Sequence, residues 1–177
     1  DNLQEQLTDW QQLKLLDAIT ILPNNDEVDI IISNWLKSPN QSVKILAMKL
    51  IRKFQLLQMH DLVADNLHDS DEKVVEETIK TLVRIEDNST SKLLIEQYQT
   101  CNEKFQIQIL KALDKISNPE NNTFLEAQAK ENPSFSVKKA SVKALNNCCS
   151  KTDLQRLAYQ SNSPELKQII NQIIQEN

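Results

Sequence analysis

The stretch Val43-Lys44-Ile45-Leu46-Ala47-Met48-Lys49-Leu50-Ile51-Arg52-Lys53-Phe54 decides the fold. Five of its apolar residues stand at offsets 0, +4, +7, +8 and +11 from Val43, a spacing that places them on one face of an α-helix. The same spacing of apolar or small residues returns four times further along the chain. The later segments begin at Val74, Phe105, Val137 and Leu166, at steps of 31, 31, 32 and 29 residues. A repeat of this length predicts an array of similar helical units.

An upstream segment fits the same template with one exception. Leu15, Ala18, Ile19 and Leu22 take the later positions, whereas Gln11 stands in the first. We therefore expect a first helix over about residues 4–22. Residues 1–30 carry seven acidic side chains and one lysine, so this helix is expected to form a polar cap on the array.

A second helix is expected before each of the last five repeated helices. These partner helices are predicted at about residues 26–38, 58–69, 90–101, 121–131 and 152–161. All five prolines fall between predicted helices, where proline breaks no backbone hydrogen bond. Ser, Asp and Asn in the turns are predicted to cap the helices that follow them. The sequence therefore predicts an all-α chain of antiparallel helix pairs.

The turn Asp69-Ser70-Asp71 and the pairs Val43-Lys44 and Ala144-Leu145 resemble HEAT repeats, in particular the short bacterial kind called phycocyanobilin-lyase-like. This resemblance covers essentially the whole chain. It implies an armadillo-like α-α superhelix, a right-handed solenoid of about five helix pairs and an N-terminal capping helix. The first helices would line the convex face, and the second helices the concave face.

The same resemblance implies one domain, residues 1–177, divided at helix-pair boundaries. The expected divisions are approximately 1–23 for the capping helix, then 24–57, 58–87, 88–118, 119–150 and 151–177. The sequence departs from the family where a glycine normally closes the second helix. Gln55, Glu86, Ser117 and Cys149 stand at these places, and a nearby Asn or Asp is expected to take the left-handed conformation.

Composition excludes several functions. The chain has 177 residues and no glycine, which rules out a P-loop, a dinucleotide-binding fingerprint, a nucleophile elbow and an EF-hand loop. Its net charge of −5 gives no general attraction to nucleic acid or to anionic membranes. No apolar run reaches the 18 or more residues of a membrane span, so no membrane insertion is expected of this segment.

The residues that commonly carry catalysis or hold metals form no recognisable constellation. His60 and His68 lie eight residues apart, not four, so they are interpreted as part of a solvated acidic face and not as a zinc pair. Cys148 occupies an apolar position of the repeat and is expected to be a small buried residue. No CxxC spacing occurs. We therefore predict no enzyme activity, no metal and no cofactor.

Three cysteines without a disulfide framework favour a reducing, cytoplasmic location. The sequence starts at Asp1 with no initiator methionine, so it is interpreted either as a processed product or as a piece of a larger chain, from which an upstream anchor or signal would have been removed.

Lysine recurs at the sixth residue after the start of four consecutive repeats. These residues are Lys49, Lys80, Lys111 and Lys143, and four residues further on stand Lys53, Arg84 and Lys115. At 100° per residue they fall about 240–280° from the first core position, away from the apolar stripe. With the resemblance, they would form a basic ridge along one flank of the concave face. The alternative is that Lys and Arg are simply good helix formers on a wet surface.

The first functional hypothesis is a non-catalytic scaffold or regulatory domain that binds a protein partner, with the ridge as the candidate binding surface, within a larger or membrane-tethered chain. The alternative is a phosphate- or nucleic-acid-binding module that uses the lysine ridge. Nucleic acid is disfavoured because no stacking aromatics are interleaved with the lysines, and Trp10 and Trp35 are expected to pack in the core or at its end. A third hypothesis, an accessory such as a bilin lyase, comes only from the name of the repeat type.

The apolar helix Leu166–Ile174 has no further repeat after it. Two alternatives remain open for this helix. It either closes the core or provides a surface for docking, including oligomerisation.

Overall fold

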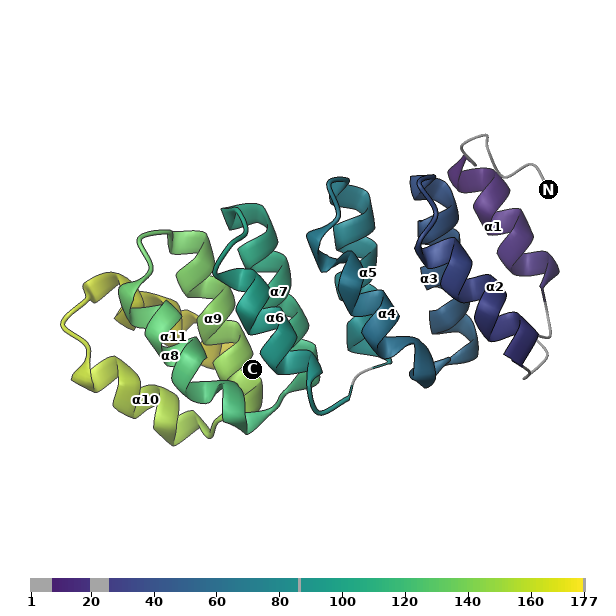
Figure 1. The fold of residues 1–177 in the computed structure, drawn as a ribbon. Helices are drawn as coiled ribbons and strands as arrows, with labels where there is room; N and C mark the ends of the chain where they lie inside the picture. The colour runs from purple at the N-terminus through teal and green to yellow at the C-terminus, as the bar shows by residue number, and fades with distance from the viewer. Residues whose placement is uncertain (1–7, 20–25, 86, 177) are drawn as a thin grey trace. The chain divides into compact units, whose positions relative to one another are not determined.

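The computed structural model describes residues 8–19, 26–85 and 87–176, and all regular structure in these residues is helical (Figure 1). The α-helices are α1 Asp9–Ala18, α2 Asp26–Leu36, α3 Gln41–Phe54, α4 His60–Ala64, α5 Glu72–Arg84, α6 Thr90–Tyr98, α7 Glu103–Ile116, α8 Asn122–Glu131, α9 Phe135–Cys148, α10 Lys151–Gln160 and α11 Pro164–Glu176. Three short 3₁₀ helices are η1 Leu57–Met59, η2 Asp65–His68 and η3 Pro119–Asn121. The predicted all-α class is confirmed. The chain forms two compact units, Asp1–Thr90 and Ser91–Asn177.

The five repeated helices lie where the apolar period predicts them, as α3, α5, α7, α9 and α11. Their first apolar residues are buried, from Val43 in α3 to Leu166 in α11. In the first unit α3 packs against α5. In the second unit α7 packs against α9, and α9 against α11. The capping prediction is also confirmed, because Asn40, Asp71 and Asn102 accept backbone N–H bonds at the starts of α3, α5 and α7.

Four of the five partner helices are shorter than predicted, whereas α10 has the predicted length. The segment expected as one helix over 58–69 divides into η1, α4 and η2. Asn66 contributes to this, since its side-chain amide donates to the backbone oxygen of Leu62 at 3.0 Å and competes with the regular helical bonds. In α2 the predicted core residue Ile31 is 48% exposed, whereas Ile32 and Leu36 are buried.

The apolar stripe predicted for the first helix is wrong. Leu15 and Ala18 are exposed, and the buried residue is Gln12. Gln11 does not take a core position, because it forms a capping box with Thr8 at the start of α1. The expected packing of Trp10 is also wrong, since this side chain is 66% exposed. Leu22 and residues 4–7 lie outside the described residues.

Two repeated helices end in a left-handed residue that is not glycine. Gln55 and Ser117, which stand at the positions of the expected glycines, have positive φ angles of 53° and 52°. The expectation that a neighbouring Asn or Asp would take this conformation is therefore wrong. Cys149 is extended at the end of α9, and Glu86 lies outside the described residues. The left-handed conformation costs a residue with a Cβ about 1 kcal/mol.

Replacing Gln55 by glycine is expected to stabilise the protein by about 0.5–1 kcal/mol. The side chain of Gln55 is exposed, so its loss removes little packing, whereas the left-handed strain is relieved. Thermal unfolding followed by circular dichroism measures the gain. Gln55→Ala is the matched control, because alanine keeps the Cβ. Equal melting temperatures for the glycine and alanine variants would show that the helix end carries no such strain.

A buried tyrosine links α6 to α8 in the second unit. The Tyr98 hydroxyl donates to Gln128 Oε1 at 2.8 Å and accepts from Asn132 Nδ2 at 3.2 Å. Its ring meets Phe124 edge to face, with centroids 5.1 Å apart. Burial raises the pKa of Tyr98 to about 12, since the phenolate would lose its hydration.

This raised pKa predicts a loss of stability at high pH. Between the ordinary tyrosine pKa of about 10 and the folded pKa, the unfolded chain loses the Tyr98 proton and the folded chain keeps it, so unfolding becomes easier as pH rises. The difference in unfolding free energy between the wild type and Tyr98→Phe is expected to fall by about 2 kcal/mol from about pH 9 to pH 11.5. Urea denaturation at the two pH values measures it. If this difference in unfolding free energy were the same at both pH values, the Tyr98 hydroxyl would be exposed to water and not buried.

The apolar side of α11 is buried within the second unit. Leu166, Ile169, Ile170 and Ile173 are all at most 4% exposed, and α11 packs on α9 and α10. Of the two alternatives for this helix, the structure supports the first, in which it closes the core. These side chains are already covered, so docking or oligomerisation here would have to use the polar side of α11.

Candidate functional site

The seven residues of the predicted ridge occupy four helices. Lys49 and Lys53 lie on α3, Lys80 and Arg84 on α5, Lys111 and Lys115 on α7, and Lys143 on α9. All are exposed except Lys49, which is half-buried, so they do face away from the buried stripes of their helices. Their surroundings nevertheless differ between the two units. Partner binding by these residues stays a prediction.

Two of the ridge lysines in the first unit hold α1 against α3. Lys49 Nζ donates to Oε1 of the buried Gln12 at 2.8 Å. Lys53 Nζ donates to the backbone oxygens of Leu16 and Ile19, the latter at 2.8 Å. These oxygens belong to the C-terminal end of α1, where a cation is favoured by the helix dipole. Lys49 and Lys53 therefore have a structural role.

Of the other two ridge cations in the first unit, one already has a carboxylate nearby. Lys80 Nζ lies 3.7 Å from Oε2 of Glu77, one turn earlier on α5. Arg84 is exposed at the last turn of the same helix. These contacts and this nearby carboxylate leave the ridge without a concentrated positive site in the described part of the first unit.

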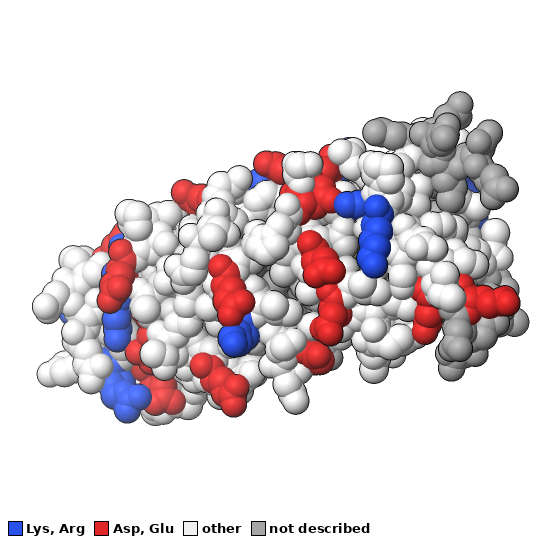
Figure 2. All heavy atoms as spheres, viewed as in Figure 1, with Lys and Arg blue, Asp and Glu red and all other residues white. Residues whose placement is uncertain are grey.

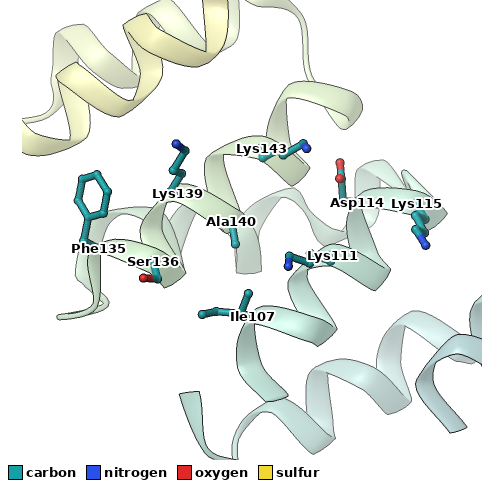
Figure 3. A pocket seen from close by; sticks show the side chains of 9 residues that line it. All are labelled: Ile107, Lys111, Asp114, Lys115, Phe135, Ser136, Lys139, Ala140 and Lys143. Carbon is teal, nitrogen blue, oxygen red and sulfur yellow. The ribbon is translucent and has the colours of Figure 1, made fainter. Parts of the chain in front are cut away.

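The second unit brings its ridge lysines together around a cavity of about 500 Å³ on its surface, between α7 and α9. We call this cavity the α7–α9 groove. It is lined by Lys111 and Lys115 from α7 and by Lys143 from α9. A fourth lysine, Lys139, also lines it and was missed by sequence analysis. Figure 3 shows Lys111 and Ala140 pointing toward one another across the space between the two helices.

The reason for missing Lys139 is its place in the repeat. It stands two residues after the first apolar position, where the other repeats have Ile45, Glu76 and Ile107. Only one repeat carries a lysine there, so no period marks it. It joins the site because the sides of α7 and α9 that carry positions +2 and +6 face the same cavity.

Two hydrogen bonds fix how α7 and α9 lie beside each other. At their N-terminal ends Ser134 Oγ donates to Glu103 at 2.7 Å. At their C-terminal ends Asn147 Nδ2 donates to Asp114 at 2.5 Å. The helices are therefore parallel and in register. The groove runs from an end with Phe135, Ile107 and one lysine, Lys139, which we call the apolar end, to a cationic end with Lys111, Lys143 and Lys115.

The charge of the groove is strongly unbalanced. Asp114 is its one carboxylate among the described lining residues, and it accepts the bond from Asn147. No hydrogen bond or ion pair joins any of the four lysines to another described residue. Acidic side chains predominate on the face of the molecule seen in Figure 2, in keeping with the net charge of −5. The groove is therefore a local concentration of positive charge on an acidic protein.

An aromatic side chain accompanies these lysines. Phe135 is the first residue of α9, follows the capping residue Ser134, and is 49% exposed in the groove. The expectation that no aromatic accompanies the ridge is therefore wrong for the second unit. The sequence signal was present, because Phe135 stands four residues before Lys139 and thus on the same side of the helix.

His60 does not lie on a solvated face, which corrects the sequence interpretation. It is 4% exposed, and its Nε2 lies 2.8 Å from Thr90 Oγ1. Its Nδ1 is 3.3 Å from Asp61, and its Nε2 is 3.5 Å from Asp87. These contacts join α4 to the start of α6. Across residues 8–19, 26–85 and 87–176, no group of three or more His, Cys, Asp or Glu side chains is placed to hold a metal ion.

The three cysteines are free thiols, and all are half-buried. Cys148 is thus less buried than predicted, because it lies in the last turn of α9, where the core ends. Burial raises the pKa of Cys101, Cys148 and Cys149, which keeps the thiols protonated. A protonated thiol is a poor nucleophile.

None of the helices in the described part of the chain is long and apolar enough to cross a bilayer. No protein-family model matches the chain, and no curated protein matches it either.

Proposed function

We propose that the chain is a non-catalytic protein-binding module of HEAT-like helix pairs, and that it binds an acidic region of its partner in the α7–α9 groove. One observation carries this proposal, namely the four lysines that line one groove beside a single carboxylate, Asp114, among the described lining residues. The solenoid arrangement is part of the proposal. It is supported by the repeat period of 29–32 residues and by the packing of α7 on α9 and α9 on α11.

Electrostatics favours an anionic partner. Like charges that share a groove repel one another, so an anion that enters it gains attraction and removes this repulsion. The rest of the protein is acidic, which limits non-specific attraction of anions to other surfaces. Such a site gives specificity for one acidic segment.

The non-catalytic part of the proposal rests on the chemistry of the same site. Lysines that act as bases or nucleophiles are usually buried away from water. The four lysines of the groove are exposed, so they fit a binding role. We place the module in a reducing, cytoplasmic compartment, in agreement with its three free thiols.

The second candidate is a phosphate- or single-stranded nucleic-acid-binding module. Phe135 favours it, because an exposed ring beside lysines is a platform on which a base can stack. Four lysines predict a log–log salt slope of about −3 for single strands. The protein partner leads because Phe135 is the one aromatic among the described residues that line the groove.

A charge-reversal pair tests the proposed function. Lys111→Glu with Lys143→Glu is expected to weaken capture of the partner at least about tenfold, since two attractive pairs become repulsive. The control is Lys92→Glu with Lys167→Glu, two exposed positions of the same unit outside the groove. Both doubles change the net charge by the same amount. Affinity capture from lysate of the native host, with quantitative mass spectrometry, compares them.

A partner retained by the wild type and the control but lost from the groove variant supports the proposal. A partner retained equally by all three would exclude the groove as its site. Circular dichroism spectra must first show that all three proteins are equally helical.

A further inference from the structure

We infer that the α7–α9 groove takes a short, extended peptide segment that carries an apolar side chain at one end and at least two carboxylates at the other. This inference rests on the proposed function, and it adds the chemical order of the partner segment.

The apolar end of the groove can hold an uncharged side chain. Phe135 is half exposed to solvent there, and Ile107 and Ala140 line the neighbouring wall. Lys139 lies at the level of Ile107, so this end carries one lysine beside its apolar side chains. Figure 3 shows Ile107 and Ala140 pointing into the space between the helices. An aliphatic or aromatic side chain placed on them would cover apolar surface that now faces water.

The cationic end selects carboxylates. Lys111, Lys115 and Lys143 lie here, one or two turns further along their helices than Ile107 and Phe135. Asp114 is held by Asn147, so it repels a carboxylate placed next to it. Carboxylates of the partner are therefore directed to the lysines on either side of Asp114.

The length of the site sets the length of the segment. Ile107 and Lys115 are eight residues apart on α7, which corresponds to about 12 Å along the helix axis. An extended peptide advances about 3.3 Å per residue, so about four residues join the two ends. One apolar residue and two or three acidic residues fill this distance.

The exposure of the lining residues favours a peptide over an enclosed small molecule. Lys111, Lys115, Phe135, Lys139 and Lys143 are all exposed, so the site is open along its length. Sites for small molecules usually enclose most of the ligand surface. A groove that is open along its length instead allows a peptide chain to enter and leave at both ends.

An array of fluorescein-labelled hexapeptides tests the inference with the full-length protein. Each peptide contains one leucine and three glutamates, and the array includes every order of these residues. Matched control peptides have alanine in place of the leucine or glutamine in place of the glutamates. Fluorescence anisotropy at low salt measures affinity. A peptide with leucine two to four residues from the glutamates is expected to bind about tenfold more tightly than its alanine match.

Two protein variants connect the preference to the groove. Phe135→Ala is expected to remove the preference for leucine but to keep weak binding of acidic peptides, whereas Lys143→Glu weakens all acidic peptides. Tyr159→Ala is the control, because Tyr159 is an 88% exposed aromatic of the same unit on α10.

Equal affinities for leucine and alanine peptides, both lowered by Lys143→Glu, would overturn the inference and leave the proposed function standing. Binding of no acidic peptide would overturn the inference, and the charge-reversal capture experiment then decides the proposed function separately. Tighter binding of an oligothymidine, with a salt slope near −3 and sensitivity to Phe135→Ala, would replace both with the nucleic-acid alternative.

Discussion

Leu113→Ala is expected to lower the free energy of unfolding by about 3 kcal/mol or more. Leu113 is fully buried on α7, directly between the exposed Lys111 and Lys115 in sequence. Removing a buried leucine side chain costs its transfer free energy and leaves a cavity, together about 2.7–5 kcal/mol. This is a large share of the 5–15 kcal/mol that stabilises an ordinary domain.

Lys111→Ala is the matched control on the same helix. Its side chain is exposed and has no described partner, so its removal is expected to change stability by less than about 0.5 kcal/mol. Urea denaturation of both variants, followed by circular dichroism, measures the contrast. Similar losses for the two variants would mean that the buried and exposed sides of α7 are assigned the wrong way round.

The second large loss of unfolding free energy is expected when Arg52 on α3 is replaced. Its guanidinium pairs with the carboxylate of Glu77 on α5 and donates from Nη1 to Thr81 Oγ1 at 3.1 Å. The Glu77 side chain is 9% exposed and that of Arg52 is 25% exposed. Arg52→Met would break the buried pair and leave Lys80, whose Nζ lies 3.7 Å from Oε2, as the nearest described cation of Glu77. Breaking a buried pair costs about 3–5 kcal/mol. Because Arg52 retains some water contact, we expect about 3 kcal/mol.

A double-mutant cycle separates the pair from the packing of the two side chains. Arg52→Met with Glu77→Leu removes both charges, so it is expected to be more stable than Arg52→Met alone. Chemical denaturation of the four proteins gives the coupling free energy. A coupling free energy near zero would show that water, and not the pair, satisfies the two charges.

The repeated helices were predictable because a long stripe of apolar residues at helical spacing indicates an α-helix with one buried face. Val43, Val74 and Phe105 recur at a constant period and are all buried in the structure. Within the units α3 packs against α5, α7 against α9, and α9 against α11, so periodicity and packing agree. The left-handed Gln55 was not predictable in the same way, since its conformation follows from the path of the chain and not from its own preference.

The first helix was predicted poorly because polar contacts decide which side it buries. The side chain of Gln12 enters the interior to meet Lys49, which is 37 residues away in sequence. No local pattern contains this information. His60 is similar, because it is buried by its contact with Thr90, 30 residues further on.

The candidate site was half predictable for a related reason. Lys49 and Lys143 occupy the same position in their repeats and point in the same direction around their helices. The sequence pattern therefore predicts the same solvent exposure for both. The two lysines have different surroundings in the structure. Lys49 donates a hydrogen bond to Gln12, whereas Lys143 lines an open groove. Lys139 and Phe135 became part of the site only through the parallel register of α7 and α9.

Site-specific photocrosslinking tests most directly whether the partner occupies the α7–α9 groove. Benzoylphenylalanine would replace Phe135 in one protein and Tyr159 in another, and both would be irradiated in lysate of the native host. We predict a crosslinked partner from position 135 that disappears when Lys143→Glu is added, and none from position 159. A partner crosslinked from position 159 alone, or from position 135 regardless of Lys143→Glu, would contradict the account.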